Sequence, residues 1–289
     1  MKKKILIGAA VLVFLALTAV CIFKLPELQK FTKGGEKIKG NIENIKIECT
    51  GGSVTIATTP RVYFSLEEKP AAKNKADATI EWLVAGNTLK IRCGCEEETE
   101  YIIGVPAETA LDDLDIKGDG IKADISGITV RDLTLRTGSG SLNVKESKCI
   151  DALIAETKSA DVCIDSTFAR RMDIETESGK ATVTAPSFQR DCKIVTNSGD
   201  INIEVLEDSK LNIIESHGKG SFTSTFESAA DGEKFTLRTR SGKIDIAAYT
   251  GNETPAAEQT TAAPAEIPAG TVKAEESTAK SKETKSKKS

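Results

Sequence analysis

His217 is the only histidine in the chain, and it is the clearest candidate for catalysis because an imidazole can activate a serine hydroxyl as a nucleophile. Stacking of the repeats described below would place it between those that carry Ser198 and Ser241. The sequence has no G-x-S-x-G elbow, the turn that presents the serine of many hydrolases. We interpret His217 as a turn residue in a degenerate repeat, and we expect no catalytic residue and no enzyme activity.

Seven cysteines are the other reactive side chains, and their spacing gives neither a disulfide framework nor a C-x-x-C pair. They are Cys21, Cys49, Cys93, Cys95, Cys149, Cys163 and Cys192. The Cys-Gly-Cys run at 93–95 places two thiols on one strand face, but a metal site needs about four ligands and no second pair is evident. We expect cysteines that behave as small hydrophobes, with no metal and no cofactor.

The Ser-Gly-Asp run at 198–200 is similar to part of a calcium-binding repeat. Such repeats have a nine-residue period with Asp in every unit. The period here is 19–20 residues and Asp alternates with Lys, so we expect no calcium site.

The composition limits both the core and the partners. Aromatic residues make up 4% of the chain, so a core must be built from Ile, Val, Leu and Ala, which suits stacked strands. The scarcity of aromatic side chains also disfavours an enzyme that acts on polysaccharides. Residues 1–39 carry a net charge of +6, residues 40–250 carry −10, and residues 251–289 are neutral. An acidic body repels nucleic acid, so we expect no nucleic-acid partner.

A repeat runs through the second half of the chain, marked by a Ser-Gly step at intervals of 20, 19, 20, 19 and 24 residues. The steps are Ser139-Gly140, Ser159-Ala160, Ser178-Gly179, Ser198-Gly199, His217-Gly218 and Ser241-Gly242. We expect each step to form a turn, with Gly in an unusual φ and Ser making a local side-chain bond. The long last interval indicates an insertion near residues 228–232, and residues 222–232 are a candidate cap for the open end of the stack.

Apolar residues alternate with polar ones on both sides of each step, as in Leu142/Val144 and Ile244/Ile246. Alternation with period two marks a strand with one buried face. Two short strands and two turns in about 20 residues form one coil, in which each strand pairs in parallel with the strand one repeat later. Weaker copies lie at 114–125 and 45–56, and residues 80–93 predict a hairpin. The predicted fold is all-β, a single-domain β-solenoid after an N-terminal transmembrane helix.

The outward positions follow the same register. The residues after the Ser-Gly steps include Asp161, Lys180, Asp200 and Lys219, which would form an alternating charge ladder across the stack. Two positions further on, a mostly polar outward row is expected, made of Asn143, Cys163, Thr182, Asn202 and Asp245. Each exposed ion pair contributes only about 0.2–1 kcal/mol, so the charge ladder would set register more than stability.

The T-x-S-G-x-(apolar)-x-(apolar) units, together with the lead-in YIIGVPAETALDDLDIKGDG at 101–120, resemble a known family. It is the bacterial putative-adhesin family of LiaG-like and YvlB-like envelope proteins, and the resemblance covers about residues 40–250. It implies a β-solenoid, usually membrane-tethered, with no established biochemical activity.

The N-terminus predicts a membrane anchor. Residues 5–23 contain no charge, and a helix of that length spans roughly 28 Å of the ~30 Å hydrocarbon core. An uncleaved signal-anchor is favoured over a cleaved signal peptide because residues 19–23 form a poor cleavage site, and over a lipoprotein because Val20 precedes Cys21. A short basic N-terminus before a long apolar run favours export. The five Lys between 24 and 39 favour a cytoplasmic body under the positive-inside rule.

Four segments are predicted: a membrane anchor (1–23), a basic linker (24–39), a β-solenoid (40–250) and a disordered tail rich in Ala, Thr, Pro, Glu and Lys (251–289). We expect a single-pass protein of the cell membrane with an extracytoplasmic body. Its solenoid would be a non-enzymatic scaffold for contact with an envelope protein or a glycan. The alternative is a membrane-tethered accessory or regulator of an envelope-stress signalling system.

Overall fold

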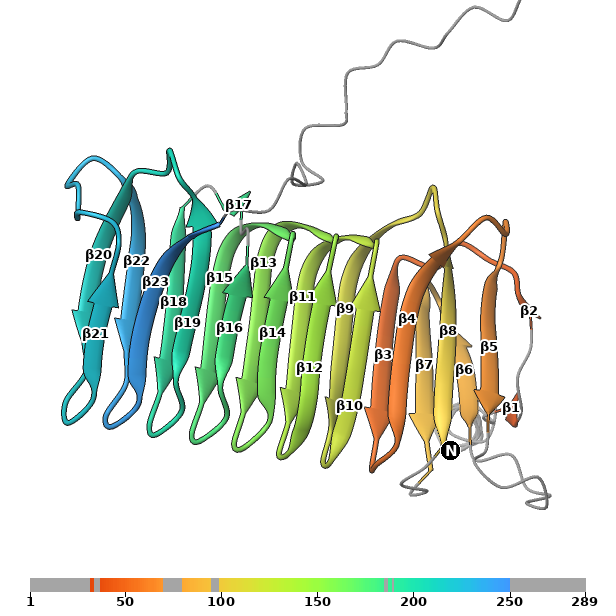
Figure 1. Cartoon of the computed structure of the whole chain (residues 1–289). Coiled ribbons are helices and arrows are strands. Elements are labelled where there is room, and N and C mark those ends of the chain that lie inside the picture. The colour runs from red at the N-terminus through yellow and green to blue at the C-terminus, as the bar shows by residue number, and fades with distance from the viewer. Residues whose placement is uncertain are drawn as a thin grey trace, which may run out of the picture. The chain divides into compact units, whose positions relative to one another are not determined.

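The computed structural model describes residues 32–33, 37–69, 80–94, 99–184, 187–188 and 190–249. This described part is all-β, without a helix, and its strands form two sheets (Figure 1). The all-β class predicted from the sequence is therefore confirmed. The predicted anchor at 5–23 and the tail at 251–289 lie outside the described residues. Within the described ranges, no helix is long and apolar enough to cross a membrane.

Sheet A has twelve strands and sheet B has eleven. In spatial order, sheet A consists of β1 (Thr32–Lys33), β6 (Glu81–Ala85), β7 (Thr88–Cys93), β3 (Asn44–Cys49), β9 (Ala110–Gly118), β11 (Thr129–Thr137), β13 (Lys148–Thr157), β15 (Phe168–Thr176), β18 (Asp191–Thr196), β22 (Glu233–Arg238) and β20 (Leu211–Ser216), with β17 (Ser187–Phe188) pairing beside β15. Sheet B consists of β2 (Lys37–Ile38), β5 (Phe64–Lys69), β8 (Glu100–Pro106), β4 (Ser53–Thr59), β10 (Ile121–Ser126), β12 (Gly140–Lys145), β14 (Asp161–Asp165), β16 (Ala181–Thr184), β19 (Ile201–Leu206), β23 (Lys243–Tyr249) and β21 (Ser221–Ser224).

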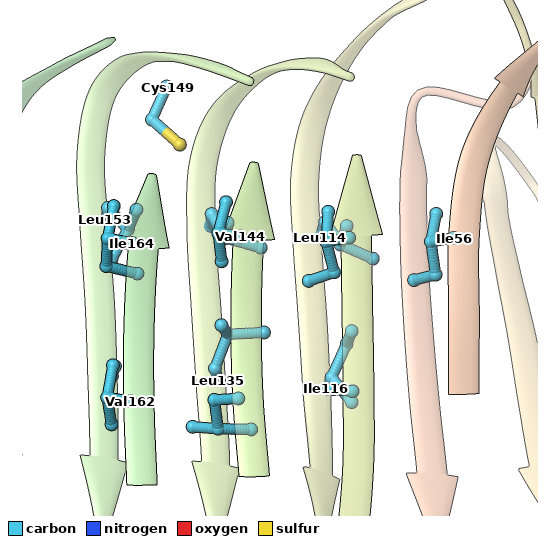
Figure 2. Close-up of a cluster of buried hydrophobic side chains, with 14 of the residues drawn as sticks. Ile56, Leu114, Ile116, Leu135, Val144, Cys149, Leu153, Val162 and Ile164 are labelled. Carbon is cyan, nitrogen blue, oxygen red and sulfur yellow. The ribbon is translucent and has the colours of Figure 1, made fainter. Parts of the chain in front are cut away.

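The core lies between the two sheets and is built from the alternating apolar residues. In β12 the side chains of Leu142 and Val144 are fully buried, while Asn143 between them is half-buried on the outer face. Figure 2 shows Val144, Leu153 and Ile164 in the space between the two strands of their coils. Strands of this kind cannot bury their inner face alone, so the coils must stack.

A coil consists of one sheet A strand, a turn and the following sheet B strand. Between Ala110 and Tyr249 there are seven such coils. Neighbouring coils pair in parallel, and Leu135, Ala155 and Ile174 lie opposite one another in β11, β13 and β15. This pairing at intervals of 19–20 residues confirms the predicted register in the middle of the stack.

The N-terminal coil, formed by β3 and β4, is not at the end of the stack. It lies between β9/β10 on one side and β7/β8 on the other (Figure 1). Residues 81–93 form the predicted hairpin, in which β6 and β7 are antiparallel and Gly86 has a φ of 63°. Strands β7 and β8 therefore cover a coil that precedes them in the sequence.

The last two coils are stacked in the reverse of their chain order, which corrects the sequential stacking expected from the repeat. Strands β22/β23 lie between β18/β19 and the outermost pair β20/β21. The inner positions explain this order. Phe235, Leu237, Ile244 and Ile246 are fully buried, so their coil needs a neighbour on both sides. In the outermost coil, the residues opposite Leu237 and Ile246 are polar, namely Glu215 and Ser224, and polar groups are better placed at an end of the core.

The segment between β21 and β22, residues 225–232, lies along the free edge of β20. The N–H of Ala229 donates to the carbonyl of Leu211 over 2.7 Å, and the N–H of Ile213 donates to the Ser228 hydroxyl over 2.9 Å. These bonds satisfy backbone groups of an edge strand that would otherwise be open to pairing with another chain. The insertion expected to cap the stack therefore covers part of its edge.

Candidate functional site

Five of the six predicted Ser-Gly turns are closed by the threonine two residues before the serine position. The Thr176 hydroxyl accepts the N–H of Gly179 over 2.9 Å, and the Thr196 hydroxyl donates to the carbonyl of Gly199 over 2.6 Å. A buried hydroxyl requires such a partner. The buried threonines form a row through the core: Thr137, Thr157, Thr176, Thr196 and Thr239. Sequence reasoning missed their role, although the threonine of T-x-S-G was the available signal.

The serines of these turns link neighbouring coils, which corrects the local bond predicted for them. The N–H and the hydroxyl of Ser178 both donate to the carbonyl of Lys158, over 2.8 and 3.3 Å. Ser198 makes the same two contacts with the carbonyl of Glu177, over 2.9 and 3.4 Å. The Ser-Gly step is therefore an inter-coil connection.

The step glycines are required mainly for space. Only Gly140 and Gly218 have a positive φ, of 104° and 44°. The unusual φ predicted for Gly179, Gly199 and Gly242 is wrong. At each of these three positions, a Cβ would overlap with a backbone carbonyl oxygen of the neighbouring coil. Close stacking therefore excludes a side chain at these three positions, whereas the equivalent step residue Ala160 carries a methyl group and is buried.

The alignment of His217-Gly218 with a Ser-Gly step is wrong by two residues. In the pairing of β20 with β22, Ser216 lies opposite Arg238, so His217 takes the place of the turn-closing Thr239. The pairing of β21 with β23 has the same offset, because it places Ser221 opposite Lys243. The misalignment arose because the outermost coil lacks the T-x-S-G sequence.

His217 also does not lie between the two serine-bearing coils, because the coil of Ser241 separates it from the coil of Ser198. Its Nδ1 lies 2.6 Å from Oε2 of Glu215. Its ring stacks on Phe222, with centroids 6.4 Å apart and planes at 15°. Among the described residues, its hydrogen-bond partner is a carboxylate rather than a serine hydroxyl. This arrangement orients the imidazole at the end of the core and provides no nucleophile.

The described cysteines differ in exposure. Cys49, Cys93, Cys149 and Cys192 are buried, and Cys163 is partly exposed on sheet B. Burial is the main cause that raises the pKa of Cys149 to about 12, and it also raises the pKa of Cys163. Cys21 and Cys95 lie outside the described residues. In the described part of the chain, no group of three or more His, Cys, Asp or Glu could hold a metal ion.

The outer face of sheet B carries the predicted polar row in register. Asn143, Cys163, Thr182, Asn202 and Asp245 lie opposite one another on consecutive strands of the sheet. The row continues through Asp124 to Thr55, and the carboxylate of Asp124 accepts a hydrogen bond from the side-chain amide of Asn143 over 2.7 Å. Because paired strands are about 4.8 Å apart, the row presents short polar groups at that spacing on a flat face.

The outer face of sheet A carries long charged side chains that pair with one another. Arg136 contacts Asp115 over 3.7 Å and Glu156 over 2.8 Å. Lys193 pairs with Asp173 and Glu175 on the neighbouring strand. These charges are therefore already compensated within the face.

The predicted charge ladder has a different order and a different kind of bond. Because β19 pairs with β23, Lys243 rather than Lys219 follows Asp200. The carboxylate of Asp161 accepts the backbone N–H of Lys180 over 2.8 Å, and that of Asp200 accepts the N–H of Lys243 over 2.7 Å. These bonds join the turns of neighbouring coils through the backbone.

A shallow depression of about 380 Å³ lies where three of the turns meet sheet A. Its charged lining residues are of both signs: Lys117, Asp119, Arg136, Glu156 and Lys158. The carboxylate of Asp119 packs where a Cβ of Gly138 would be. The mixed charges of the depression do not select an anion or a cation.

Two parallel sheets that face each other and are joined coil by coil define a β-solenoid. The model of the Toastrack DUF4097 family matches residues 42–289, and the chain belongs to this family. The family relationship expected from the repeat is therefore confirmed. No match was found among curated proteins.

Several solved structures are similar to the chain, including the following three. A putative cell adhesion protein from Clostridium sporogenes is 10% identical, covers 76% of this chain and 100% of its own, and has a TM-score of 0.35. A putative adhesin from Bacteroides fragilis is 15% identical, with coverages of 76% and 97% and a TM-score of 0.46. A putative adhesin from Parabacteroides distasonis is 16% identical, with the same coverages and a TM-score of 0.43.

Proposed function

We propose that this chain is a non-enzymatic, membrane-anchored protein of the cell envelope whose solenoid is a scaffold for contact with a protein or a glycan. The uncharged segment 5–23 supports the anchor, and the basic N-terminus before it supports export. The observation that carries the contact role is the polar row on the flat outer face of sheet B.

The polar row of sheet B suits contact because its own side chains are short, although longer charged side chains such as Lys145 and Lys243 flank it. Thr182 and Asn202 lose less rotamer freedom when they are immobilised than a Lys or an Arg would lose. Their hydroxyl and amide groups can donate and accept hydrogen bonds, which suits either a glycan or a polypeptide backbone. A partner with a repeating polar structure could follow the row from strand to strand.

Sheet A suits contact less well. Covering Arg136 or Lys193 would remove water from ion pairs that are already formed, and that desolvation opposes binding. The two faces of one molecule therefore provide a built-in comparison, with sheet B as the proposed contact face and sheet A as its control.

Site-specific photocrosslinking in intact cells tests the proposal. A photoreactive residue is placed at Asn202 on sheet B or, as the matched control, at Thr134 on sheet A; both side chains are half-buried. We expect capture of an envelope protein or a glycan from position 202 and little capture from position 134. Equal capture from both positions would contradict the assignment of the contact face.

The identity of the captured material separates the proposal from its alternative. If position 202 captured only an adjacent membrane signalling protein, the chain would be a tethered accessory or regulator of an envelope-stress system. Protease treatment of intact cells tests the location separately, since an extracytoplasmic solenoid would be accessible from outside.

A further inference from the structure

Cys49 and Cys93 lie directly opposite each other on the neighbouring parallel strands β3 and β7. Both side chains point into the core, with 2% and 6% of their surfaces exposed. The two residues are far apart in the sequence, and they meet only because the β6–β7 hairpin packs beside β3.

The register places this pair within reach of a disulfide. Paired strands lie about 4.8 Å apart, which falls inside the 4.4–6.8 Å range of Cα separations in disulfides. A hydrogen bond with Cys49 is the main cause that raises the pKa of the Cys93 thiol, followed by burial. The two buried thiols therefore face each other on adjacent strands of the folded chain.

The other described cysteines provide an internal comparison, because none has a cysteine opposite it. Cys149 lies opposite Val130 and Ala169. Cys163 lies opposite Asn143 and Thr182, and Cys192 lies opposite Met172 and Phe235. Among the described residues, Cys49 and Cys93 are the one cysteine pair in register.

A bond between these residues would have a defined effect on the fold. Strand β3 is also paired with β9, the first strand of the continuous repeat, and Cys49 lies opposite Gly118 there. The bond would therefore tie the β6–β7 hairpin covalently to β3, the strand that pairs with the start of the repeat.

We propose that Cys49 and Cys93 form a disulfide site that is oxidised by thiol–disulfide exchange while the chain folds. One cysteine thiolate attacks a small-molecule or protein disulfide, forms a mixed disulfide and releases one thiol. The second thiolate attacks the sulfur of the first cysteine, forms the Cys49–Cys93 bond and releases the second thiol. The cysteines lose two electrons and two protons, and the two released thiols gain them. The burial of both side chains requires that the exchange precede closure of the core.

The test uses the full chain, reduced and unfolded, then refolded in a buffer of oxidised and reduced glutathione. Free thiols are alkylated, and the disulfides are identified by peptide mapping without reductant. We expect one dominant crosslink, between Cys49 and Cys93, with Cys149, Cys163 and Cys192 alkylated. Alkylated Cys49 and Cys93, or crosslinks to the other three at comparable yield, would overturn the proposal.

Two further measurements sharpen the result. The same glutathione mixture, added to the folded reduced chain, should form the crosslink at least ten times more slowly; an equal rate would contradict formation before closure. The Cys95→Ser variant should keep the crosslink, and its loss would show that residue 95 is the true partner. The Cys149→Ser variant is the matched control and should also keep it. None of these outcomes depends on the proposed contact function.

Discussion

The hydroxyls of Thr157 and Thr176 lie 3.3 Å apart in the core, on neighbouring coils. Each also closes its own turn: Thr157 accepts the N–H of Ala160 over 3.0 Å, and Thr176 accepts that of Gly179 over 2.9 Å. One side chain therefore joins the local geometry of a turn to the stacking of two coils. This connection explains how a row of threonines can lie inside an otherwise apolar core.

Replacing Thr176 with Val should destabilise the fold, because the buried N–H of Gly179 would lose its acceptor. We expect a loss of about 1–3 kcal/mol in the free energy of unfolding, measured by denaturant titration. The matched control is Thr182→Val on the outer face of sheet B, which should change stability by about 0.5 kcal/mol or less. Equal effects of the two variants would show that the Thr176 hydroxyl has no structural role.

Replacing Gly199 with Ala should separate two coils, since the new Cβ would overlap with the carbonyl oxygen of Gly179. We expect destabilisation of about 2 kcal/mol or more, measured by thermal and denaturant unfolding. Ser198→Ala, one residue away, removes only an exposed hydroxyl contact of 3.4 Å and should cost less than about 1 kcal/mol. A Gly199→Ala variant as stable as the wild type would contradict the close stacking.

The stability of the chain should fall in alkali because of Cys149. Burial, helped by Asp132, raises the pKa of this thiol from 9.0 to about 12. The unfolded state therefore loses this proton at a lower pH than the folded state does. As a result, the free energy of unfolding is highest below about pH 9 and falls as the pH rises towards 12. We expect a loss of about 1 kcal/mol by pH 10 from this group.

The Cys149→Ala variant isolates that contribution. Its free energy of unfolding should fall less steeply between pH 8 and pH 10 than that of the wild type. Cys163→Ala, which removes a partly exposed thiol, should change the slope less. Identical slopes for the wild type and Cys149→Ala would contradict the assignment.

The wild type and the His217→Ala variant should behave alike in a screen for hydrolase activity. The reason is that the imidazole contacts Glu215 and Phe222 rather than a serine. Screening the wild type and the variant against ester and glycoside substrates checks this. Loss of the stack on Phe222 should lower stability by about 1 kcal/mol. A substrate hydrolysed by the wild type but not by the variant would reopen the catalytic interpretation.

Local patterns predicted the coils well, because burial of one strand face depends on residues two positions apart. Leu142 and Val144, or Ile244 and Ile246, mark their strands without reference to the rest of the chain. The order of the terminal coils could not be obtained in this way. That order depends on which coil can leave its inner face without a neighbour. Glu215 and Ser224 place polar side chains on the inner face of their coil, so that coil can lie at the end of the stack.

The chemistry of the turns and cysteines was harder to predict for the same reason. The need for Gly199 comes from a carbonyl oxygen in another coil, so its φ gives no sign of it. Cys49 meets Cys93 only through the pairing of β3 with β7. Gly199 and Gly179 lie one repeat apart, but their close approach depends on how tightly the coils stack, whereas the repeat period does not relate Cys49 to Cys93 at all.

The central functional claim is that sheet B is the contact face, and one binding measurement tests it most directly. The labelled chain is incubated with envelope preparations, and retention is compared for the wild type, Thr182→Arg on sheet B and Thr134→Arg on sheet A. We predict at least a tenfold loss of affinity for Thr182→Arg and near wild-type affinity for Thr134→Arg, with both variants folded. Equal affinities for the two variants, or a loss confined to Thr134→Arg, would contradict the claim.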